Sequence, residues 1–363
     1  MKTKHSLLFI SLCFFLVAQI SWAGRAPLSN VAADPYASAL VLDADTGETL
    51  FARNADAPVY PASTLKLMVL LVILDQIEQG SLQLDEMVQV TVEAYKMGGS
   101  QVYLDPKEQF PLEDLLYALM IQSANDAAVA LAIHVAGTTE AFVTLMNQKA
   151  EELGMKNTRF HSVHGLPPAK GQKVDVTTAR DFGTLCRYLS KRPEVFKYTG
   201  IQEKDFRGGE FIMRTHNHLL KEVAGCDGFK TGYFAKAGFS IAATAKKGNV
   251  RIIAIVMGSK SSKVRDTKAI ELLAKGFAKV PARAAIQVSV TQEQLTTPVT
   301  PMTEKAKTAV IQSQQKLPPA PSPSDNGWGT FFIGLGLGFF LYAALDFLVL
   351  RRRSKSGRRN RRF

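Results

Sequence analysis

The segment Leu65–Ile77 most restricts how this chain can fold, because at helical spacing its side chains are apolar almost all the way round. A helix without a polar face has to be buried. Pro61 suits the first turn of this helix, and Gly80 suits its end. We expect the helix to begin at Ser63-Thr64-Leu65-Lys66, which places a hydroxyl and an amine one turn apart on the same side.

Ser63 and Lys66 have the chemical types of a nucleophile and its base. A serine hydroxyl is a weak nucleophile until a base takes its proton. Lys66 can serve only as a free amine, which requires a pKa far below its reference value of about 10.4. Burial and a neighbouring cation would lower the pKa, and Lys230 is the candidate for that cation. The helix N-terminus would favour a developing oxyanion near Ser63.

Ser-x-x-Lys alone is a weak signal, because an N-cap serine followed by a solvated lysine gives the same pattern. Ser313–Lys316 also matches it, inside a stretch rich in Gln and Pro. Two further motifs favour chemistry at Ser63: Ser123-Ala124-Asn125 and Lys230-Thr231-Gly232 follow in the order of penicillin-recognising serine enzymes. A second literal match, Ser324-Asp325-Asn326, comes after Lys230 and among prolines, so we set it aside.

Four stretches of the chain resemble the D-alanyl-D-alanine carboxypeptidases, the low-molecular-mass penicillin-binding proteins. The stretches are residues 61–68, 123–132, 164–166 and 227–233, and the resemblance extends from about Ala32 to about Val280. It implies an acyl-enzyme formed on Ser63 and a reaction that needs no cofactor.

The resemblance also implies a role for each matched residue. Ser63 attacks the carbonyl between two D-alanines, Lys66 accepts the serine proton, and Ser123 relays a proton to the leaving amine. The remaining roles concern binding: Asn125 orients Lys66 and a substrate amide, Lys230 adds positive potential, Thr231 binds the terminal carboxylate, Gly232 leaves room for the substrate backbone, and the N–H groups of Ser63 and Tyr233 form the oxyanion hole.

The chain departs from the family pattern at two places. Phe234 stands where relatives commonly have threonine. His216 stands where some relatives have an arginine that grips the substrate carboxylate, and Arg214 lies two residues earlier. The cationic partner of the carboxylate is therefore left open.

The histidines and cysteines raise two further possibilities, a metal site and a disulfide, and both have weaker support than the serine motifs. His216-x-His218 would place both rings on one face of a strand, but a closed zinc site needs further ligands, so we expect no metal. Cys13 leaves with the signal peptide, whereas Cys186 and Cys226 are able to pair only if the fold brings them together.

The order of the predicted elements indicates an α/β fold, with an antiparallel sheet covered by helices and an inserted helical lobe. Ser38–Leu42 and Glu48–Ala52 read as strands, and a helix-rich region extends to Tyr188. Strands return near the third motif, and a helix closes the domain. These later elements are Phe229–Gly232, Phe239–Lys246, Val250–Met257 with a hairpin turn at Gly248-Asn249, and the helix Ser262–Lys279.

The two ends of the chain indicate export and membrane anchoring. Residues 1–23 read as a signal peptide, and residues 24–280 as the catalytic domain. Residues 281–327 form a linker rich in Pro, Gln, Thr and Ser, residues 328–350 a transmembrane helix, and residues 351–363 a basic cytoplasmic tail. The apolar run 331–350 is long enough to cross a hydrocarbon core of ~30 Å. We therefore expect an inner-membrane protein with a periplasmic catalytic domain.

The net charge of +12 says little about partners of the catalytic domain, because eight cations lie after residue 350 and two in the signal peptide, which leaves +2. The membrane junction explains the basic tail without nucleic acid.

The sequence as a whole predicts a serine D-Ala-D-Ala carboxypeptidase that trims peptidoglycan stem peptides and is acylated by beta-lactams. A beta-lactamase is the enzymatic alternative, although no Glu-x-x-Leu-Asn occurs in the chain. An inactive wall-binding scaffold is the non-enzymatic one. Endopeptidase and transpeptidase activities share the acyl-enzyme and stay open, as does the oligomeric state.

Overall fold

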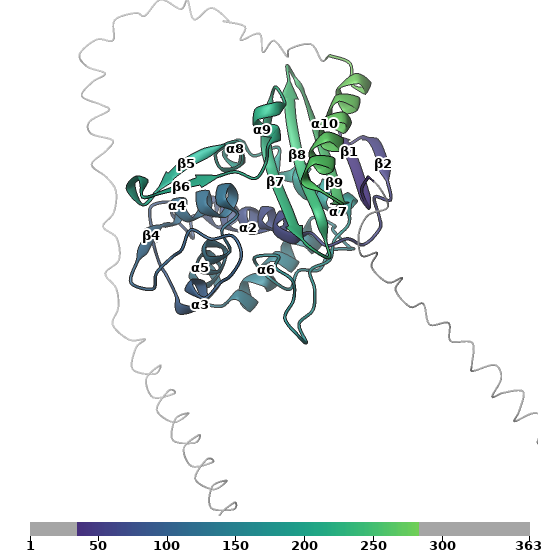
Figure 1. Cartoon of the computed structure of the whole chain (residues 1–363). Coiled ribbons are helices and arrows are strands. Elements are labelled where there is room, and N and C mark those ends of the chain that lie inside the picture. The colour runs from purple at the N-terminus through teal and green to yellow at the C-terminus, as the bar shows by residue number, and fades with distance from the viewer. Residues whose placement is uncertain (1–34, 283–363) are drawn as a thin grey trace, which may run out of the picture. The chain divides into compact units, whose positions relative to one another are not determined.

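The computed structural model describes residues 35–282 (Figure 1). The predicted signal peptide, nearly all of the linker, the transmembrane helix and the basic tail lie outside these residues.

The main sheet of the described fold is antiparallel and has five strands in the order β2-β1-β9-β8-β7. The chain enters through its first two strands, leaves the sheet for the helical region, and returns for the last three (Figure 1). The strands are β1 (Ser38–Asp43), β2 (Thr49–Arg53), β7 (Cys226–Phe234), β8 (Gly238–Lys247) and β9 (Val250–Ser259). Strand β7 is therefore an edge strand of this sheet.

The segment between β2 and β7 is mainly helical and carries two short hairpins. Its helical elements are the 3₁₀ turn η1 (Ala62–Leu65), α2 (Lys66–Glu78), α3 (Val92–Tyr95), α4 (Leu112–Tyr117), the π-helical turn η2 (Ala118–Gln122), α5 (Asn125–Ala136), α6 (Thr139–Glu152), α7 (Ala179–Leu189), α8 (Pro193–Thr199), the 3₁₀ turn η3 (Arg207–Gly209) and α9 (Leu219–Glu222). The hairpins pair β3 (Met87–Gln89) with β4 (Gln109–Pro111) and β5 (Glu203–Phe206) with β6 (Phe211–Arg214). After β9, helix α10 (Ser262–Lys279) ends the described fold.

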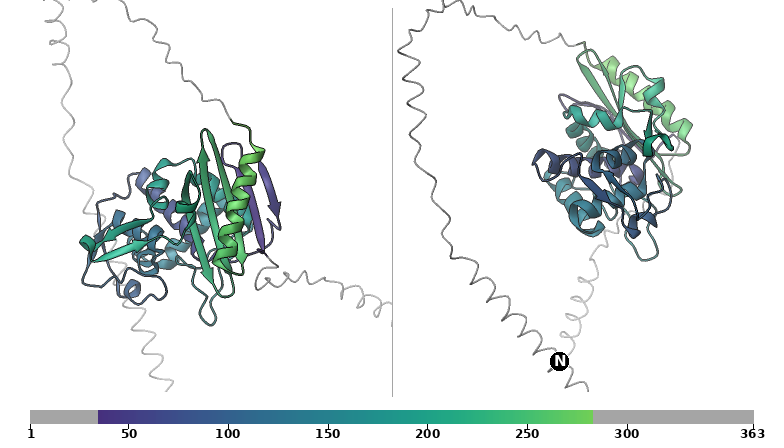
Figure 2. Two further views of the ribbon diagram at one scale, coloured as in Figure 1. Left: turned by 45° about the horizontal axis from the view of Figure 1, so that its top comes forward. Right: turned by 90° about the vertical axis from the view of Figure 1, so that its left-hand side faces the viewer.

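The sheet is covered on both faces, so β1 is buried along its whole length. Its side chains alternate between two cores: Leu40 and Leu42 join the large core of the helical lobe, whereas Ala39 and Val41 join the core beneath α10. Figure 2 shows α10 running along its face of the sheet. Close contact of α10 depends on Gly276, where a Cβ atom would lie 2.6 Å from a methyl carbon of Ile252.

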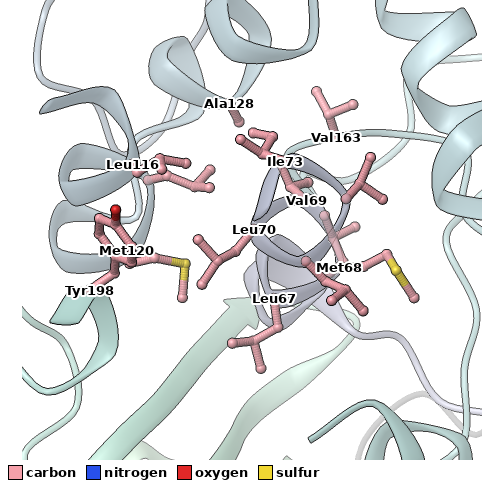
Figure 3. Packing of buried hydrophobic residues seen from close by; sticks show 14 of the residues in the cluster. Leu67, Met68, Val69, Leu70, Ile73, Leu116, Met120, Ala128, Val163 and Tyr198 are labelled. Atoms are coloured by element: carbon pink, nitrogen blue, oxygen red, sulfur yellow. The ribbon is translucent and has the colours of Figure 1, made fainter. Parts of the chain in front are cut away.

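Helix α2 lies at the centre of the helical lobe. Its residues from Lys66 to Asp75 are all buried, and Figure 3 shows its apolar side chains pointing in different directions into the surrounding elements. The partners labelled there include Leu116 of α4, Met120 of η2, Ala128 of α5 and Tyr198 of α8. Burial of each such aliphatic side chain contributes about 1.5–3 kcal/mol, so α2 is held firmly and its first residue has a fixed position.

The structure confirms the antiparallel sheet with helices that the sequence predicts, and α10 has the predicted bounds. Three expectations need correction. The α-helix begins at Lys66 and not at Ser63, because Ala62 has a left-handed φ of 48° and residues Ala62–Leu65 form a tighter 3₁₀ turn. Helices continue past Tyr188 to Thr199 in α8. His216 and His218 lie in the turn after β6 and not on a strand.

Among residues 35–282, no single helix has the length and apolar character needed to cross a membrane. Helices α5 and α6 together meet that requirement, but they are bent by 84° where they join.

Candidate active site

Ser63 and Lys66 lie in contact at the junction of η1 and α2. Nζ of Lys66 is 3.2 Å from Oγ of Ser63. The amine also lies 2.7 Å from Oδ1 of Asn125 and 2.7 Å from the carbonyl oxygen of His164, and both oxygens accept hydrogen bonds from it. A neutral amine has two hydrogens and one lone pair. Because the two acceptors take both hydrogens, the lone pair is left for the proton of Ser63.

The surroundings of Lys66 favour that neutral form. The side chain is fully buried. Burial, followed by the nearby charge of Lys230, holds the Lys66 pKa well below its usual value, while the carboxylates of Asp126 and Asp175 act in the opposite direction. The dry pocket and the second cation that a lysine base requires are thus both present.

Ser123 comes to the site from the turn between η2 and α5. It is buried and has a left-handed backbone, with φ 61° and ψ 30°. A non-glycine residue with this conformation costs of order 1–3 kcal/mol and occurs mostly where the surrounding structure imposes it. Here the π-helical turn ends at Ser123 and α5 starts two residues later, so the serine lies at the cleft wall between two helical elements.

Asn125, the first residue of α5, has both ends of its side chain fixed. Oδ1 accepts from Lys66, and Nδ2 donates to the carbonyl oxygen of Gly98 at 2.7 Å. The backbone N–H of Asn125 donates to Ser100, whose hydroxyl in turn donates to Gln122. These bonds set the amide orientation, so the oxygen points at the amine.

Strand β7 supplies the third motif along the sheet edge. Lys230 and Thr231 are buried, and Tyr233 is half exposed and stacks on Phe239 with 4.0 Å between ring centroids. At Gly232 a Cβ atom would lie 3.0 Å or less from backbone atoms of residues 61, 63 and 64. We expected Gly232 to admit the substrate backbone, and the structure gives it a second duty: it lets β7 approach the turn that carries Ser63.

Gly165 packs against the same turn. Its φ is +76°, and a Cβ atom there would collide with the carbonyl group of Ala62 and lie 3.0 Å from the backbone nitrogen of Ser63. The nucleophile therefore lies on a turn that is in close backbone contact with both β7 and the loop of His164, and these two contacts together form a clamp.

A cleft of about 390 Å³ brings these residues together with others that the motifs do not include. Its walls are formed by Ser63, Gly99, Ser100, Ser123, Asn125, Leu166, His216, His218, Thr231, Gly232, Tyr233, Phe239, Ser262 and Arg265. Lys66 and Lys230 lie behind this surface, because both are buried.

Arg265 is the cation that sequence reasoning missed. It lies on α10, is 4% exposed, lines the cleft and pairs with the neighbouring Asp266 at 2.7 Å. Burial and the Arg265 charge lower the pKa of Lys230 to about 7. In sequence, Arg265 stands among Lys263, Asp266 and Lys268, a pattern typical of a solvated helix face.

The alternatives for a carboxylate-binding cation are weaker. Burial and the charges of Lys230 and Arg265 lower the pKa of His216 to about 4, so this ring is neutral at pH 7. Arg214 is exposed, pairs with Glu203 and does not line the cleft.

The metal and disulfide alternatives receive no support from the described fold. Within residues 35–282, no three His, Cys, Asp or Glu side chains are grouped so as to hold a metal ion. Cys186 and Cys226 are both free, and burial raises the pKa of each thiol.

The fold and the cleft define a class of protein, the serine acyl-transfer hydrolases that pair the nucleophile with a lysine. Comparison with known proteins identifies the family. Residues 25–261 match the family model of peptidase S11, D-alanyl-D-alanine carboxypeptidase.

Individual relatives agree with that match. The chain is 34% identical over 281 residues to D-alanyl-D-alanine carboxypeptidase DacF of Bacillus subtilis, covering 76% of this chain and 71% of DacF. Its structure is similar to that of penicillin-binding protein 6B from Escherichia coli, with a TM-score of 0.63 and 33% identity over 69% of this chain and 80% of the other. It also resembles penicillin-binding protein D2 from Listeria monocytogenes in its ampicillin-bound form, with a TM-score of 0.61 and 31% identity over 67% and 97% of the two chains. The chain belongs to the S11 family of serine-type D-Ala-D-Ala carboxypeptidases.

The clamp on the Ser63 turn predicts unequal effects for two glycine substitutions. Gly165→Ala and Gly171→Ala both place alanine at a positive φ, which costs roughly 1–2 kcal/mol, but only Gly165 has backbone atoms within 4 Å of the new Cβ. We expect Gly165→Ala to slow acylation by a labelled penicillin by at least about tenfold, since small misplacements of reacting groups are costly. Gly171→Ala should acylate like the parent. Equal acylation rates for the two variants, measured beside their unfolding free energies, would contradict the clamp.

Proposed function

We propose that this protein removes the terminal D-alanine from peptidoglycan stem peptides through an acyl-enzyme on Ser63, and that beta-lactams acylate the same serine. The observation that carries the proposal is the set of three contacts around Lys66 Nζ, because in the neutral form of the amine two of them use its hydrogens and the third places its lone pair toward the hydroxyl of Ser63. The ampicillin-bound relative supports the beta-lactam half of the proposal.

In the first step, Oγ of Ser63 bonds to the carbonyl carbon of the scissile amide, and its proton passes to Lys66 Nζ. The N–H groups of Ser63 and Tyr233 stabilise the oxyanion. Ser123 then relays the proton from Lys66 to the leaving nitrogen, so the C–N bond breaks and free D-alanine departs. Water hydrolyses the remaining ester with Lys66 again as base, which restores Ser63.

The position of β7 suits the binding of an extended peptide. As an edge strand beside the cleft, it offers backbone groups to which a substrate strand can add. Thr231 and Arg265 both line the cleft, so the hydroxyl and the guanidinium can receive the terminal carboxylate of such a peptide. Lys230 lies behind them and adds positive potential while it is protonated, below a pKa of about 7.

A nucleophile substitution tests the reaction directly. The full-length chain in detergent should release D-alanine from a D-Ala-D-Ala peptide and form a long-lived adduct with a labelled penicillin. Ser63→Ala should abolish both reactions, because no other group replaces the attacking oxygen. Rapid turnover of the drug by the parent would favour a beta-lactamase, and absence of both reactions in the parent would favour a non-catalytic scaffold.

The carboxylate assignment predicts a difference between two arginines. Arg265→Gln should lower kcat/KM for a D-Ala-D-Ala peptide by about 10–100-fold, the cost of losing a charge-assisted hydrogen bond. Arg214→Gln removes an exposed guanidinium that pairs with Glu203 and should change kcat/KM by less than about threefold. If Arg214→Gln has the larger effect, Arg214 and not Arg265 binds the carboxylate.

We also propose that the chain is exported and anchored in the inner membrane by residues 328–350, with the catalytic domain in the periplasm. The apolar run and the basic residues after it support this arrangement. Deletion of residues 328–363 should therefore move the protein from the membrane fraction to the soluble periplasmic fraction, as followed by immunoblotting. A deletion variant that stays with the membranes would show that another segment anchors the chain.

A further inference from the structure

The two oxygens that accept hydrogen bonds from Lys66 belong to segments that are each tied to one buried carboxylate. Asp126 and Asp175 are 0% and 5% exposed, and neither lines the cleft. Burial raises the pKa of both carboxyl groups, and the hydrogen bonds that they accept from N–H and O–H donors act in the opposite direction by favouring the ionised form. The reaction proposed above assigns no role to either residue.

Asp126 holds the loop that orients Asn125. Its carboxylate accepts from the backbone N–H groups of Val102 at 3.1 Å and Leu104 at 3.1 Å. The same loop begins with Gly98, whose carbonyl oxygen accepts a hydrogen bond from Nδ2 of Asn125. Asp126 directly follows Asn125 in α5. The first turn of α5 therefore accepts hydrogen bonds from the loop through Asp126 and donates one to the loop through Asn125.

Asp175 holds the loop that presents the His164 carbonyl. It accepts from the backbone N–H of Ser162 at 2.9 Å and from the Ser162 hydroxyl at 2.7 Å. That hydroxyl accepts in turn from the N–H of Gly165 at 2.9 Å. The carbonyl of His164 lies inside this bonded segment and points at the amine.

We propose that Asp126 and Asp175 are positioning residues, each of which fixes the segment that supplies one of the two acceptors of the Lys66 amine. This inference rests on the proposed function of Lys66 as the base.

The two carboxylates also balance the charges around the Lys66 amine. Burial, followed by the charge of Lys230 from β7, lowers the Lys66 pKa, and the carboxylates, from α5 and from the loop before α7, raise it. Two histidines, His164 and His216, also interact with the charge of Lys66; the pKa of each is lowered to about 4, so both rings are neutral near pH 7.

Loss of a charge and loss of a positioning hydrogen bond are expected to change the pH profile of acylation in different ways, because the acylation rate depends on the fraction of Lys66 that is deprotonated. Loss of a carboxylate removes a charge that favours the ammonium form, so the Lys66 pKa falls and the acidic limb of the pH profile moves to lower pH. Loss of a positioning bond alone lowers the rate at every pH and leaves the limb where it was.

Four variants separate these effects: Asp126→Asn, Asp175→Asn, Ser162→Ala and the control Asp181→Asn. Ser162→Ala keeps the charge of Asp175 but cuts its link to Gly165. Asp181 is another buried carboxylate, 6% exposed, that accepts from the backbone of Asn157 and the hydroxyl of Thr158 at 2.8 Å each, and these partners hold no acceptor of Lys66. The rate of acylation by a labelled penicillin is measured from pH 5 to 9 on the full-length chain, beside the unfolding temperature.

We expect both Asp→Asn variants at residues 126 and 175 to acylate about tenfold more slowly at the plateau, as for sub-ångström misplacement of a catalytic group, with the acidic limb at lower pH. Ser162→Ala should be slower with an unmoved limb, and Asp181→Asn should keep the parental profile even if it melts earlier. Profiles of Asp126→Asn and Asp175→Asn that match that of Asp181→Asn would overturn the inference. If one of the two variants does not fold, the other and Ser162→Ala still decide it. A parent that is not acylated at all would refute the proposed function instead.

Discussion

The hydrogen bonds of a single buried amine are the constraint on which this structure depends. A charged lysine in a dry interior is costly, so the neutral form is favoured, and that form is also the one able to take a proton. The two acceptors of Lys66 then determine where its lone pair points. The burial that stabilises α2 and the chemistry at its first residue therefore have the same origin, namely a helix that is enclosed by other elements.

Three distant parts of the chain meet at this amine, and each is brought there by a different kind of packing. Asn125 comes from the start of a buried helix, His164 from a loop, and Lys230 from the edge strand of the sheet. Gly165 and Gly232 allow the last two to touch the Ser63 turn, since any larger residue would meet backbone there. Left-handed backbone at Ala62 and Ser123 completes the arrangement, and such conformations persist where the surrounding structure enforces them.

Features with a local signature could be predicted from the sequence. The strands at β8 and β9, the helix α10 and the order of the three motifs follow from hydrophobic periodicity and short patterns. The hairpin of β5 and β6 was missed, because Glu203–Phe206 has no regular alternation of apolar and polar residues. Arg265 was missed because its burial depends on the packing of α10 against the cleft. The carbonyl of His164 was missed because a backbone group carries no residue-type signal.

The segments that hold the base also form part of the binding surface. Gly99 and Ser100 lie in the loop that Asp126 binds, Leu166 follows directly after the segment tied to Asp175, and all three line the cleft. A shift of either loop would therefore change the shape of the cleft and the direction of the Lys66 lone pair together. Buried ionic hydrogen bonds suit this task, because each carboxylate fixes several backbone groups at once and would be left unsatisfied if the loop moved away. The hydrogen bonds that hold the two loops thus link the shape of the cleft to the position of the Lys66 amine.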